Sequence, residues 1–274
     1  MGPPAEVTTG VPRALTIAGS DSGGGAGIQA DLKTFFALGC HGMSALTAVT
    51  AQNTVSVSGI YEVPPDFVIA QIDAVVSDIG VDSAKTGMLG SAPVVEAVAK
   101  AIEAHSITKL VVDPVMVAKS GDALLAQDAV TAVRERILPL ATVVTPNRPE
   151  AELLAGTSIR SVADMRAAAR ELHEAGATSV LVKGGHAGGD EAIDVFFDGE
   201  GFLELEAPRY NTDDTHGTGC SLAAAITAHL AKGDDLVTAV RAGKEFVTGA
   251  IRHGLRLGVG HGPVNPGWRI WEIG

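Results

Sequence analysis

At residues 214–220 the chain reads Asp214-Thr215-His216-Gly217-Thr218-Gly219-Cys220, and it runs directly into the Ala-rich stretch Ser221-Leu222-Ala223-Ala224-Ala225-Ile226. This order predicts a glycine-rich loop that opens a helix, with unpaired backbone N–H groups at the positive end of the helix dipole. Such a junction is a ready site for a phosphoryl group or for the negative charge that develops on it. A glycine-rich turn beside a structural cysteine explains the same letters, because short glycine motifs occur often.

Cys220 stands at the start of this expected helix. The dipole there favours a thiolate, and in known cases the pKa of such a cysteine falls to between ~3.5 and ~7.5. An anion cradle and an activatable nucleophile or base within one helical turn indicate group-transfer chemistry. Cys40 is the second of only two cysteines, too few for a disulfide framework.

Composition limits the class of protein. The chain has 274 residues, of which 46% are hydrophobic, so it can bury a large core. A formal net charge of −12 argues against nucleic acid or an anionic membrane as a partner. Neither a membrane-spanning apolar run nor a secretory signal is present. We therefore expect a cytoplasmic protein with a flexible tail over residues 1–13 and one domain over 14–274.

Short apolar runs alternate with helical patterns along the chain. The stripe Ile28, Leu32, Phe35 and Phe36 predicts a core-facing helix, and a capping box at Ser161–Asp164 opens another that should end at Gly176. Continuous apolar strands between helices predict an α/β fold, with a mainly parallel central sheet covered on both faces. The extended pieces near 43–61 are expected to form a small lid outside that sheet. Further expected elements are strands at 14–18, 109–112, 142–145 and 178–182, a hairpin at 192–197 and 202–206, and helices from Pro65, at 218–231 and at 235–254.

Polar and glycine-rich residues fall where the expected strands end, which is where ligands collect in open α/β sheets. The loop from Gly19 to Gly27 follows the first strand, and Asp113, Asn147 and Lys183 each follow a later one. The loop lacks both the Gly-Lys-Ser/Thr ending of a Walker loop and the full dinucleotide fingerprint. An NAD-dependent enzyme is therefore disfavoured.

Two polar residues elsewhere have alternative explanations. Asp31 lies beside the apolar stripe of its helix and needs a partner, unless it is simply an acidic residue stabilised by the helix dipole. Gln52 can hold a heterocycle through paired donor and acceptor contacts, or it can belong to a turn.

Four residues suit a magnesium site or a transferring phosphate. Asn147 and Glu150 are three apart, so they share one face of a helix if Pro146 precedes its start, and they suit a hydrated Mg²⁺ or form a capping pair. Asp113 is assigned to the same magnesium site. Lys183, beside two glycines, suits a transferring phosphoryl group, although a solvated loop lysine has the same sequence.

Taken together, the motifs from Ala14 to about Pro266 resemble bacterial hydroxymethylpyrimidine/phosphomethylpyrimidine kinases of thiamine biosynthesis, within the ribokinase-like superfamily. The segments that carry the resemblance are Ala14-Leu15-Thr16-Ile17-Ala18-Gly19-Ser20-Asp21, Gly24-Gly25-Ala26-Gly27-Ile28-Gln29-Ala30-Asp31-Leu32-Lys33, Ala51-Gln52-Asn53-Thr54, Lys85-Thr86-Gly87-Met88-Leu89, Asp113-Pro114-Val115-Met116, Ala118-Lys119-Ser120-Gly121-Asp122, Thr145-Pro146-Asn147-Arg148-Pro149-Glu150, Lys183-Gly184-Gly185-His186 and His216-Gly217-Thr218-Gly219-Cys220.

The resemblance implies a ribokinase-like fold and two ATP-dependent phosphorylations, first of 4-amino-5-hydroxymethyl-2-methylpyrimidine and then of its monophosphate. It implies that Cys220 is the proton acceptor, where most sugar kinases of the superfamily carry an aspartate. The remaining roles that it implies are an anion hole at Gly217, Thr218 and Gly219, nucleotide contacts from Lys183, Thr215, Gly217 and Gly219, Mg²⁺ at Asn147, Glu150 and Asp113, and pyrimidine contacts from Gly19, Asp31, Gln52, Met88 and Val115.

One departure from the family pattern and two alternative functions remain at this point, together with a possible homodimer. The loop at Asp21-Ser22-Gly23-Gly24 lacks the proline of the common family form Asp-Pro-Ser-Gly-Gly, which puts its rigidity in doubt. A pyridoxal/pyridoxine kinase of the same superfamily is the nearest alternative. A non-catalytic pyrimidine-binding sensor is a second, and relatives often form homodimers through their lid strands.

Overall fold

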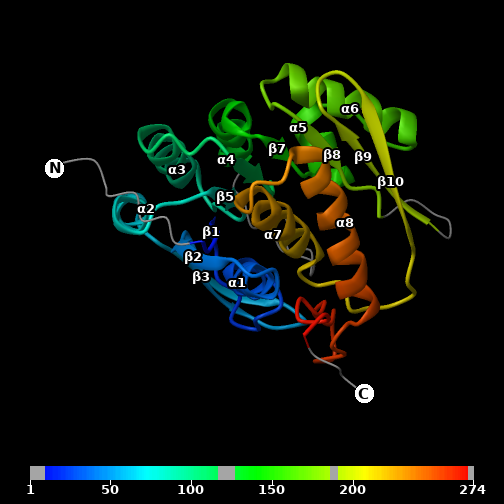
Figure 1. The fold of residues 1–274 in the computed structure, drawn as a ribbon, viewed down its shortest axis with the longest axis horizontal. Helices are drawn as coiled ribbons and strands as arrows, with labels where there is room; N and C mark the ends of the chain where they lie inside the picture. Colours follow the sequence, from blue (N-terminus) through cyan, green and yellow to red (C-terminus); the bar gives the residue numbers. More distant parts are fainter. Residues whose placement is uncertain (1–9, 117–126, 186–190, 271–274) are drawn as a thin grey trace.

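The computed structural model describes residues 10–116, 127–185 and 191–270, and its central element is an eight-stranded sheet (Figure 1). From β2 to β8 all neighbouring strands are parallel, whereas β9 runs antiparallel to both β8 and β10. The expectation of a mainly parallel sheet is confirmed. In spatial order the strands are β10 (Phe202–Pro208), β9 (Glu191–Phe197), β8 (Val180–Val182), β7 (Val143–Val144), β6 (Leu110–Val112), β5 (Ser83–Thr86), β1 (Arg13–Ala18) and β2 (His41–Leu46).

Helices cover both faces of the sheet, because its buried strands are apolar on both sides. Val111 and Val143 pack with Leu222 and Ile226 on one face, whereas Leu110 and Val144 belong to the core cluster of the other face. The first face carries α1 (Gly27–Ala37), α7 (Thr218–Ala231) and α8 (Leu236–Arg252). The second carries α2 (Pro65–Asp78), α3 (Ala92–Ala104), α4 (Gln127–Ala132), η1 (Val133–Ile137), η2 (Leu138–Leu140), α5 (Arg148–Ala155) and α6 (Val162–Glu174).

The expected lid exists but is smaller than predicted. Strands β3 (Ala48–Gln52) and β4 (Val57–Glu62) pair antiparallel as a separate two-stranded sheet. Residues 43–46, however, belong to β2 at the edge of the main sheet. Met43 and Ala45 are buried there, in register with Leu15 and Ile17 of β1, so their apolar side chains complete the core and do not cover a ligand.

The first strand starts one residue before its predicted position. Arg13 opens β1 and donates through Nη2 to Asp82 Oδ1 over 2.6 Å, so the expected tail is too long by this residue. Residues 1–9 of that tail lie outside the described residues. Within α1, Phe35 is fully buried but Phe36 is 76% exposed, so the prediction that Phe36 faces the core is wrong. Phe36 follows Phe35 by one residue, so its side chain points about 100° further around the helix axis. This places it beyond the face of α1 that packs against the core.

Two helix ends agree closely with their sequence signals. Ser161 and Asp164 form the predicted reciprocal capping box, and α6 ends at Glu174, before Gly176 with φ +118°.

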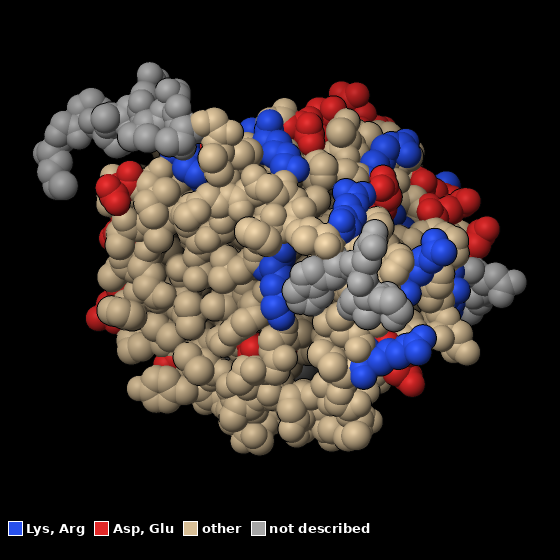
Figure 2. All heavy atoms as spheres, turned by 60° about the horizontal axis from the view of Figure 1, so that its bottom comes forward, with Lys and Arg blue, Asp and Glu red and all other residues tan. Residues whose placement is uncertain are grey.

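Across the described residues, no helix combines the length and the apolar character that a bilayer crossing requires. Figure 2 shows a face on which residues other than Lys, Arg, Asp and Glu predominate, with basic and acidic side chains interspersed mainly toward one side.

Candidate active site

A cavity of about 890 Å³ lies at the carboxyl ends of β1, β5, β6, β7 and β8. It gathers residues that lie far apart in the sequence, as the topology of an open α/β sheet requires. Asp31 is the one predicted site residue that does not line it. The predicted residues that do are Gly19, Gln52, Met88, Asp113, Val115, Asn147, Glu150, Lys183, Thr215, Gly217, Thr218, Gly219 and Cys220.

The N-terminus of α7 opens into this cavity. Its N-cap Gly217 has φ +81°, and no described side chain caps the helix. The Thr218 N–H donates to Thr215 O over 3.3 Å, and the next N–H groups, of Gly219 and Cys220, are available to a ligand. A Cβ on Gly219 would lie 3.2 Å from Lys183 Nζ and 3.4 Å from Asp113 Oδ2. The predicted glycine segment and the predicted lysine therefore meet at one point.

Lys183 is a largely buried cation between two carboxylates. Its Nζ lies 2.9 Å from Asp113 Oδ1 and 3.9 Å from Glu150 Oε2. Burial alone would lower the pKa of Lys183, but Asp113 and Glu150 raise it above its usual value, so the ammonium stays charged. Burial also raises the pKa of Glu150 to about 7, although Lys183 opposes that shift. The alternative of a solvated loop lysine is wrong.

Asn147 and Glu150 form a capping box at the start of α5. Asn147 Oδ1 accepts from the Glu150 N–H over 2.9 Å, and Glu150 Oε2 accepts from the Asn147 N–H over 2.7 Å. The capping alternative is thus confirmed. Asp113 Oδ2, in contrast, is buried and has no hydrogen-bond partner. In the described part of the chain, no cluster of three or more His, Cys, Asp or Glu side chains is arranged around a metal position.

Asp31 has the partner that its position demanded, and this partner is Lys85. The Lys85 Nζ lies 3.0 Å from both Asp31 oxygens, and Thr16 Oγ1 donates to Asp31 Oδ2 over 2.7 Å. Asp31 is fully buried, so in this conformation it does not reach a ligand in the cavity, contrary to the expected pyrimidine contact. A role for Lys85 was missed, although a lysine between Ala84 and Thr86 in a buried strand is itself an unusual signal.

The expected low pKa of Cys220 is wrong. Burial raises the pKa of this thiol to about 12, although Lys85 and the Gly27 N–H act to lower it. The carboxylates of Asp31 and Asp113 raise it further, because each disfavours a second negative charge nearby. The helix N-terminus alone therefore does not decide the protonation state of the sulfur.

A clamp between Asp21 and His216, not predicted from the sequence, holds the glycine-rich loop after β1. The Asp21 carboxylate accepts from the backbone N–H groups of Gly23, Gly25 and Ala26 over 2.8–3.0 Å, and it lies 2.8 Å from His216 Nε2. Burial alone would raise the pKa of Asp21, but these hydrogen bonds lower it below its usual range. The loop is thus fixed by side-chain contacts where the family proline is missing.

The segment after α8 ties His216 to the lid. The His216 N–H donates to Gly262 O and the Val264 N–H donates to His216 O, each over 3.0 Å. In the residue just before Gly262, the His261 N–H donates to Thr54 O over 2.9 Å, and Thr54 lies between β3 and β4. Residues from three distant parts of the sequence therefore meet beside the cavity.

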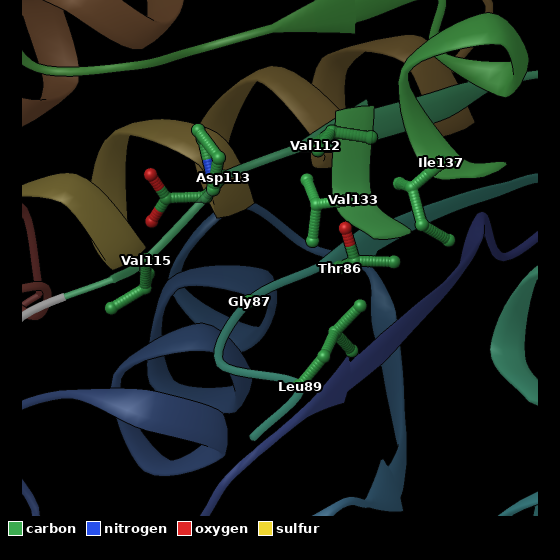
Figure 3. A pocket seen from close by; sticks show the side chains of 9 residues that line it. Thr86, Gly87, Leu89, Val112, Asp113, Val115, Val133 and Ile137 are labelled. Atoms are coloured by element: carbon green, nitrogen blue, oxygen red, sulfur yellow. The ribbon is translucent and has the colours of Figure 1, made fainter. Parts of the chain in front are cut away.

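A second pocket, of about 10 Å³, lies between the ends of β5 and β6 (Figure 3). Thr86, Leu89 and Val133 close around it, and the Asp113 carboxylate points away from them. This volume holds about one water molecule. The larger cavity is therefore the candidate active site.

A helix start without a side-chain cap at the carboxyl ends of such a sheet, beside a largely buried lysine and a two-stranded lid, defines a ribokinase-like small-molecule kinase. The chain belongs to the phosphomethylpyrimidine kinase family, whose model matches residues 21–265. It is 54% identical over 261 residues to the hydroxymethylpyrimidine/phosphomethylpyrimidine kinase of Streptomyces coelicolor, covering 95% of this chain and 96% of that protein.

Two further similarities extend the comparison. The chain is 55% identical over 251 residues to the thiamine biosynthesis bifunctional protein ThiED of Geobacter sulfurreducens, and it matches 51% of that longer protein, with 92% of its own length. The pyridoxal kinase of Staphylococcus aureus, solved with AMP-PCP and pyridoxal, superposes with a TM-score of 0.88 at 39% identity, covering 95% of each chain. The expected ribokinase-like fold is confirmed.

Proposed function

We propose that this protein transfers the γ-phosphoryl group of ATP to the hydroxymethyl group of 4-amino-5-hydroxymethyl-2-methylpyrimidine, and then phosphorylates the monophosphate, in thiamine biosynthesis. The observation that carries the proposal is the open N-terminus of α7 inside the cavity, with Lys183 beside Gly219. The name of the Streptomyces relative, similar over nearly its whole length, supports the same substrate. The proposed phosphoryl donor, ATP, is supplied in the cytoplasm, which is consistent with the expected cytoplasmic location.

The proposed roles follow from the positions of the residues. The N–H groups of Gly217, Thr218 and Gly219 hold the transferring phosphoryl group, and Lys183 balances its charge without needing to move. The Cys220 thiol first releases its proton to water, and the thiolate then accepts the hydroxyl proton of the substrate. The pyrimidine ring lies against Gly19, Met88 and Val115 with Gln52 as its polar contact, and Thr215 lies on the nucleotide side; all of these line the cavity.

Mass spectrometry of the products tests the proposal directly. The protein is incubated with MgATP and the hydroxymethylpyrimidine, and we expect a monophosphate followed by a diphosphate, with matching release of ADP. Formation of neither phosphate, with folded protein and bound pyrimidine, would instead support a sensor.

The structural similarity to pyridoxal kinase favours one second candidate, a pyridoxal/pyridoxine kinase. Both substrates present a hydroxymethyl group on a flat heterocycle, so the same cavity can accept either. We expect the larger kcat/KM for the pyrimidine, measured with each vitamin in the same ADP-coupled assay. A larger kcat/KM for pyridoxal would reverse the assignment.

We also propose that Asp113 and Glu150 hold Mg²⁺ together with phosphate oxygens of ATP. The buried, unpartnered Asp113 Oδ2 fits this cation, which prefers few protein carboxylates plus phosphate oxygens. The Asn147 amide oxygen is already engaged by its own helix, so it contributes by orienting Glu150. When bound, Mg²⁺ neutralises developing phosphate charge.

Glu150 predicts how Mg²⁺ affinity depends on pH. Since its pKa is raised to about 7, a cation must displace a proton below that pH, and its affinity should fall up to about tenfold per pH unit. Without the cation, the free energy of unfolding should fall as pH rises from 4.5 to about 7, because the folded chain binds the proton more tightly.

The Mg²⁺ dependence is measured as KM for Mg²⁺ at fixed ATP between pH 5.5 and 8.5. Glu150→Gln is the matched control, because it keeps the shape of the capping residue but cannot ionise. In this variant, KM for Mg²⁺ should retain only the pH dependence that comes from the titration of ATP itself. If KM for Mg²⁺ depends equally on pH in the unmodified protein and in Glu150→Gln, Glu150 is not a Mg²⁺ ligand.

We further propose that two copies associate through the lid. Val49 of β3 and its register partner Tyr61 of β4 share one face of the lid, and they are 46% and 73% exposed. An apolar patch of this kind favours contact with another surface. Light scattering after size exclusion should give twice the chain mass, and Tyr61→Lys should give the single chain mass.

A further inference from the structure

Ser22 and Gln52 exchange two hydrogen bonds between the glycine-rich loop after β1 and the lid. The Ser22 Oγ donates to Gln52 O and accepts from the Gln52 N–H, each over 2.8 Å. One hydroxyl thus serves both backbone groups of Gln52, as the backbone of a neighbouring residue does in a sheet. Of these two residues only Gln52 lines the cavity, so the proposed reaction leaves Ser22 without a role.

Gln52 lies at an irregular point of the lid. It is the last residue of β3, and the register of β3 with β4 shifts between Ala51 and Gln52. A shift of this kind disrupts the ladder of hydrogen bonds and changes the direction of nearby side chains. Pairing with β4 therefore holds Gln52 less firmly than the earlier residues of β3, and Ser22 supplies the missing support from the loop.

The loop that carries Ser22 is itself fixed in place. Next to Ser22 in the sequence, the Asp21 carboxylate accepts from the Gly23 N–H over 2.8 Å and lies 2.8 Å from His216 Nε2. A Cβ on Gly23 would lie 3.4 Å from Gln52 O, so the loop backbone closely approaches the end of β3. The Ser22 hydroxyl therefore extends from a fixed base across a short gap.

Thr50 connects the same loop to the side chain of Gln52. Its Oγ1 donates to Ser20 O over 2.8 Å and lies 3.3 Å from Gln52 Oε1. Thr50 is buried, so water competes little for these contacts. Gln52 is thus held from the loop at two points, its backbone by Ser22 and its side-chain amide by Thr50.

We propose that Ser22 is a positioning residue for substrate binding, which fixes the backbone of Gln52 and so holds the Gln52 amide in place for the heterocycle. The inference rests on the proposed function, in which Gln52 is the polar contact of the pyrimidine. A side chain that is held before the ligand arrives loses less conformational entropy on binding. The proline of the common family form has no hydroxyl, so at this position it cannot make either hydrogen bond.

Binding of the pyrimidine tests this role by calorimetric titration. We expect Ser22→Ala to raise Kd for the pyrimidine about tenfold, since it loses two solvent-exposed hydrogen bonds. Kd for ATP should stay unchanged, and in steady-state assays KM for the pyrimidine should rise while kcat is kept. Ser22→Thr retains the hydroxyl and should bind the pyrimidine like the unmodified protein. An unchanged Kd in Ser22→Ala, or an equal loss in Ser22→Thr, would overturn the proposal.

Amide hydrogen exchange measures the support of Gln52 without any ligand. In Ser22→Ala the Gln52 N–H loses its acceptor, so its exchange, followed by NMR, should be about tenfold faster. The Val63 N–H, which donates to Thr47 O over 2.9 Å just after β4, should exchange at an unchanged rate. Equal acceleration at Gln52 and Val63 would mean that the whole lid had loosened, and would overturn the proposal.

Ser91 provides a matched control at another attachment of the lid. Its Oγ donates over 2.7 Å to Oε1 of Glu62, the last residue of β4, in a contact that is also exposed to solvent. Ser91→Ala therefore removes a serine that ties the lid to the main domain but does not touch Gln52. Its Kd for the pyrimidine should equal that of the unmodified protein. A rise as large as that of Ser22→Ala would show that any lost attachment of the lid has this effect, and would overturn the proposal.

The same measurements keep this inference distinct from the proposed function, because binding and amide exchange need no turnover. Unchanged pyrimidine binding by Ser22→Ala, in a protein that forms the phosphorylated pyrimidine, would refute only the role of Ser22. Weaker pyrimidine binding and faster Gln52 exchange in Ser22→Ala, with no phosphorylated product from the unmodified protein, would refute only the proposed reaction.

Discussion

Replacing Cys220 with alanine is expected to lower kcat by about 10²–10⁴-fold, which is the usual contribution of a positioned general base. ATP and the pyrimidine should still bind, because the N–H groups at the start of α7 and the cavity walls do not depend on the sulfur. The measurement pairs steady-state ADP release with calorimetric titration of each ligand. Turnover close to that of the unmodified protein would refute the assignment of the base.

Two variants control this experiment. Cys40→Ala removes the other thiol, which is buried between α1 and α7 near the Ala228 carbonyl, and it should retain full turnover. Cys220→Asp supplies a carboxylate at the same position, and it should recover part of the activity that alanine loses.

The pH dependence adds a second signature of the same sulfur. Since burial raises the pKa of Cys220 to about 12, the thiol is protonated at neutral pH. We expect kcat/KM of the unmodified protein to rise with pH by up to about tenfold per unit between pH 7 and 9. Cys220→Asp should show a much flatter profile, because its carboxylate is already ionised.

Gly217→Ala is the second substitution with a large expected effect. The residue has φ +81°, and a Cβ there would collide with the Gly25 carbonyl oxygen of the loop after β1. The start of α7 and this loop must then separate, which misaligns the N–H donors. We expect kcat to fall by about 10²–10³-fold, comparable to the loss of an oxyanion-hole donor, together with a lower Tm.

Gly233→Ala, just beyond the other end of α7, is the matched control. Gly233 also has a positive φ, of +93°, but a Cβ there would meet no atom within 4 Å. This substitution tests backbone strain alone, about 1–2 kcal/mol of stability, and should leave kcat unchanged. Similar losses of kcat in both variants would show that general destabilisation, and not the contact with Gly25, is responsible.

Periodicity and strand-end chemistry predicted most of the fold and the ring of polar residues at the cavity. The segment 218–231 was predicted as a helix, and α7 has the same bounds. The same rules placed Phe36 in the core wrongly, because a helical stripe does not reveal where the covered face ends. They also assigned 43–46 to the lid, since an extended pattern does not reveal which sheet a strand joins.

The electrostatics of the site was the least predictable part. Asp31 clearly required a partner, but that partner, Lys85, lies 54 residues away and is brought near only by the pairing of β1 with β5. The predicted low pKa of Cys220 was wrong for a similar reason. Local sequence predicts the helix dipole, whereas burial and three distant side chains decide the protonation state.

The hydrogen bonds around His216 also govern when the enzyme becomes complete. Asp21 leaves the ribosome well before its partner His216 and the supporting Gly262, which emerge nearly two hundred residues or more later. The glycine loop and the lid must therefore wait without their fastening while the rest of the sheet is synthesised. Nascent chains released before Gly262 should carry a nearly finished scaffold but no working kinase, so catalysis requires synthesis through Gly262.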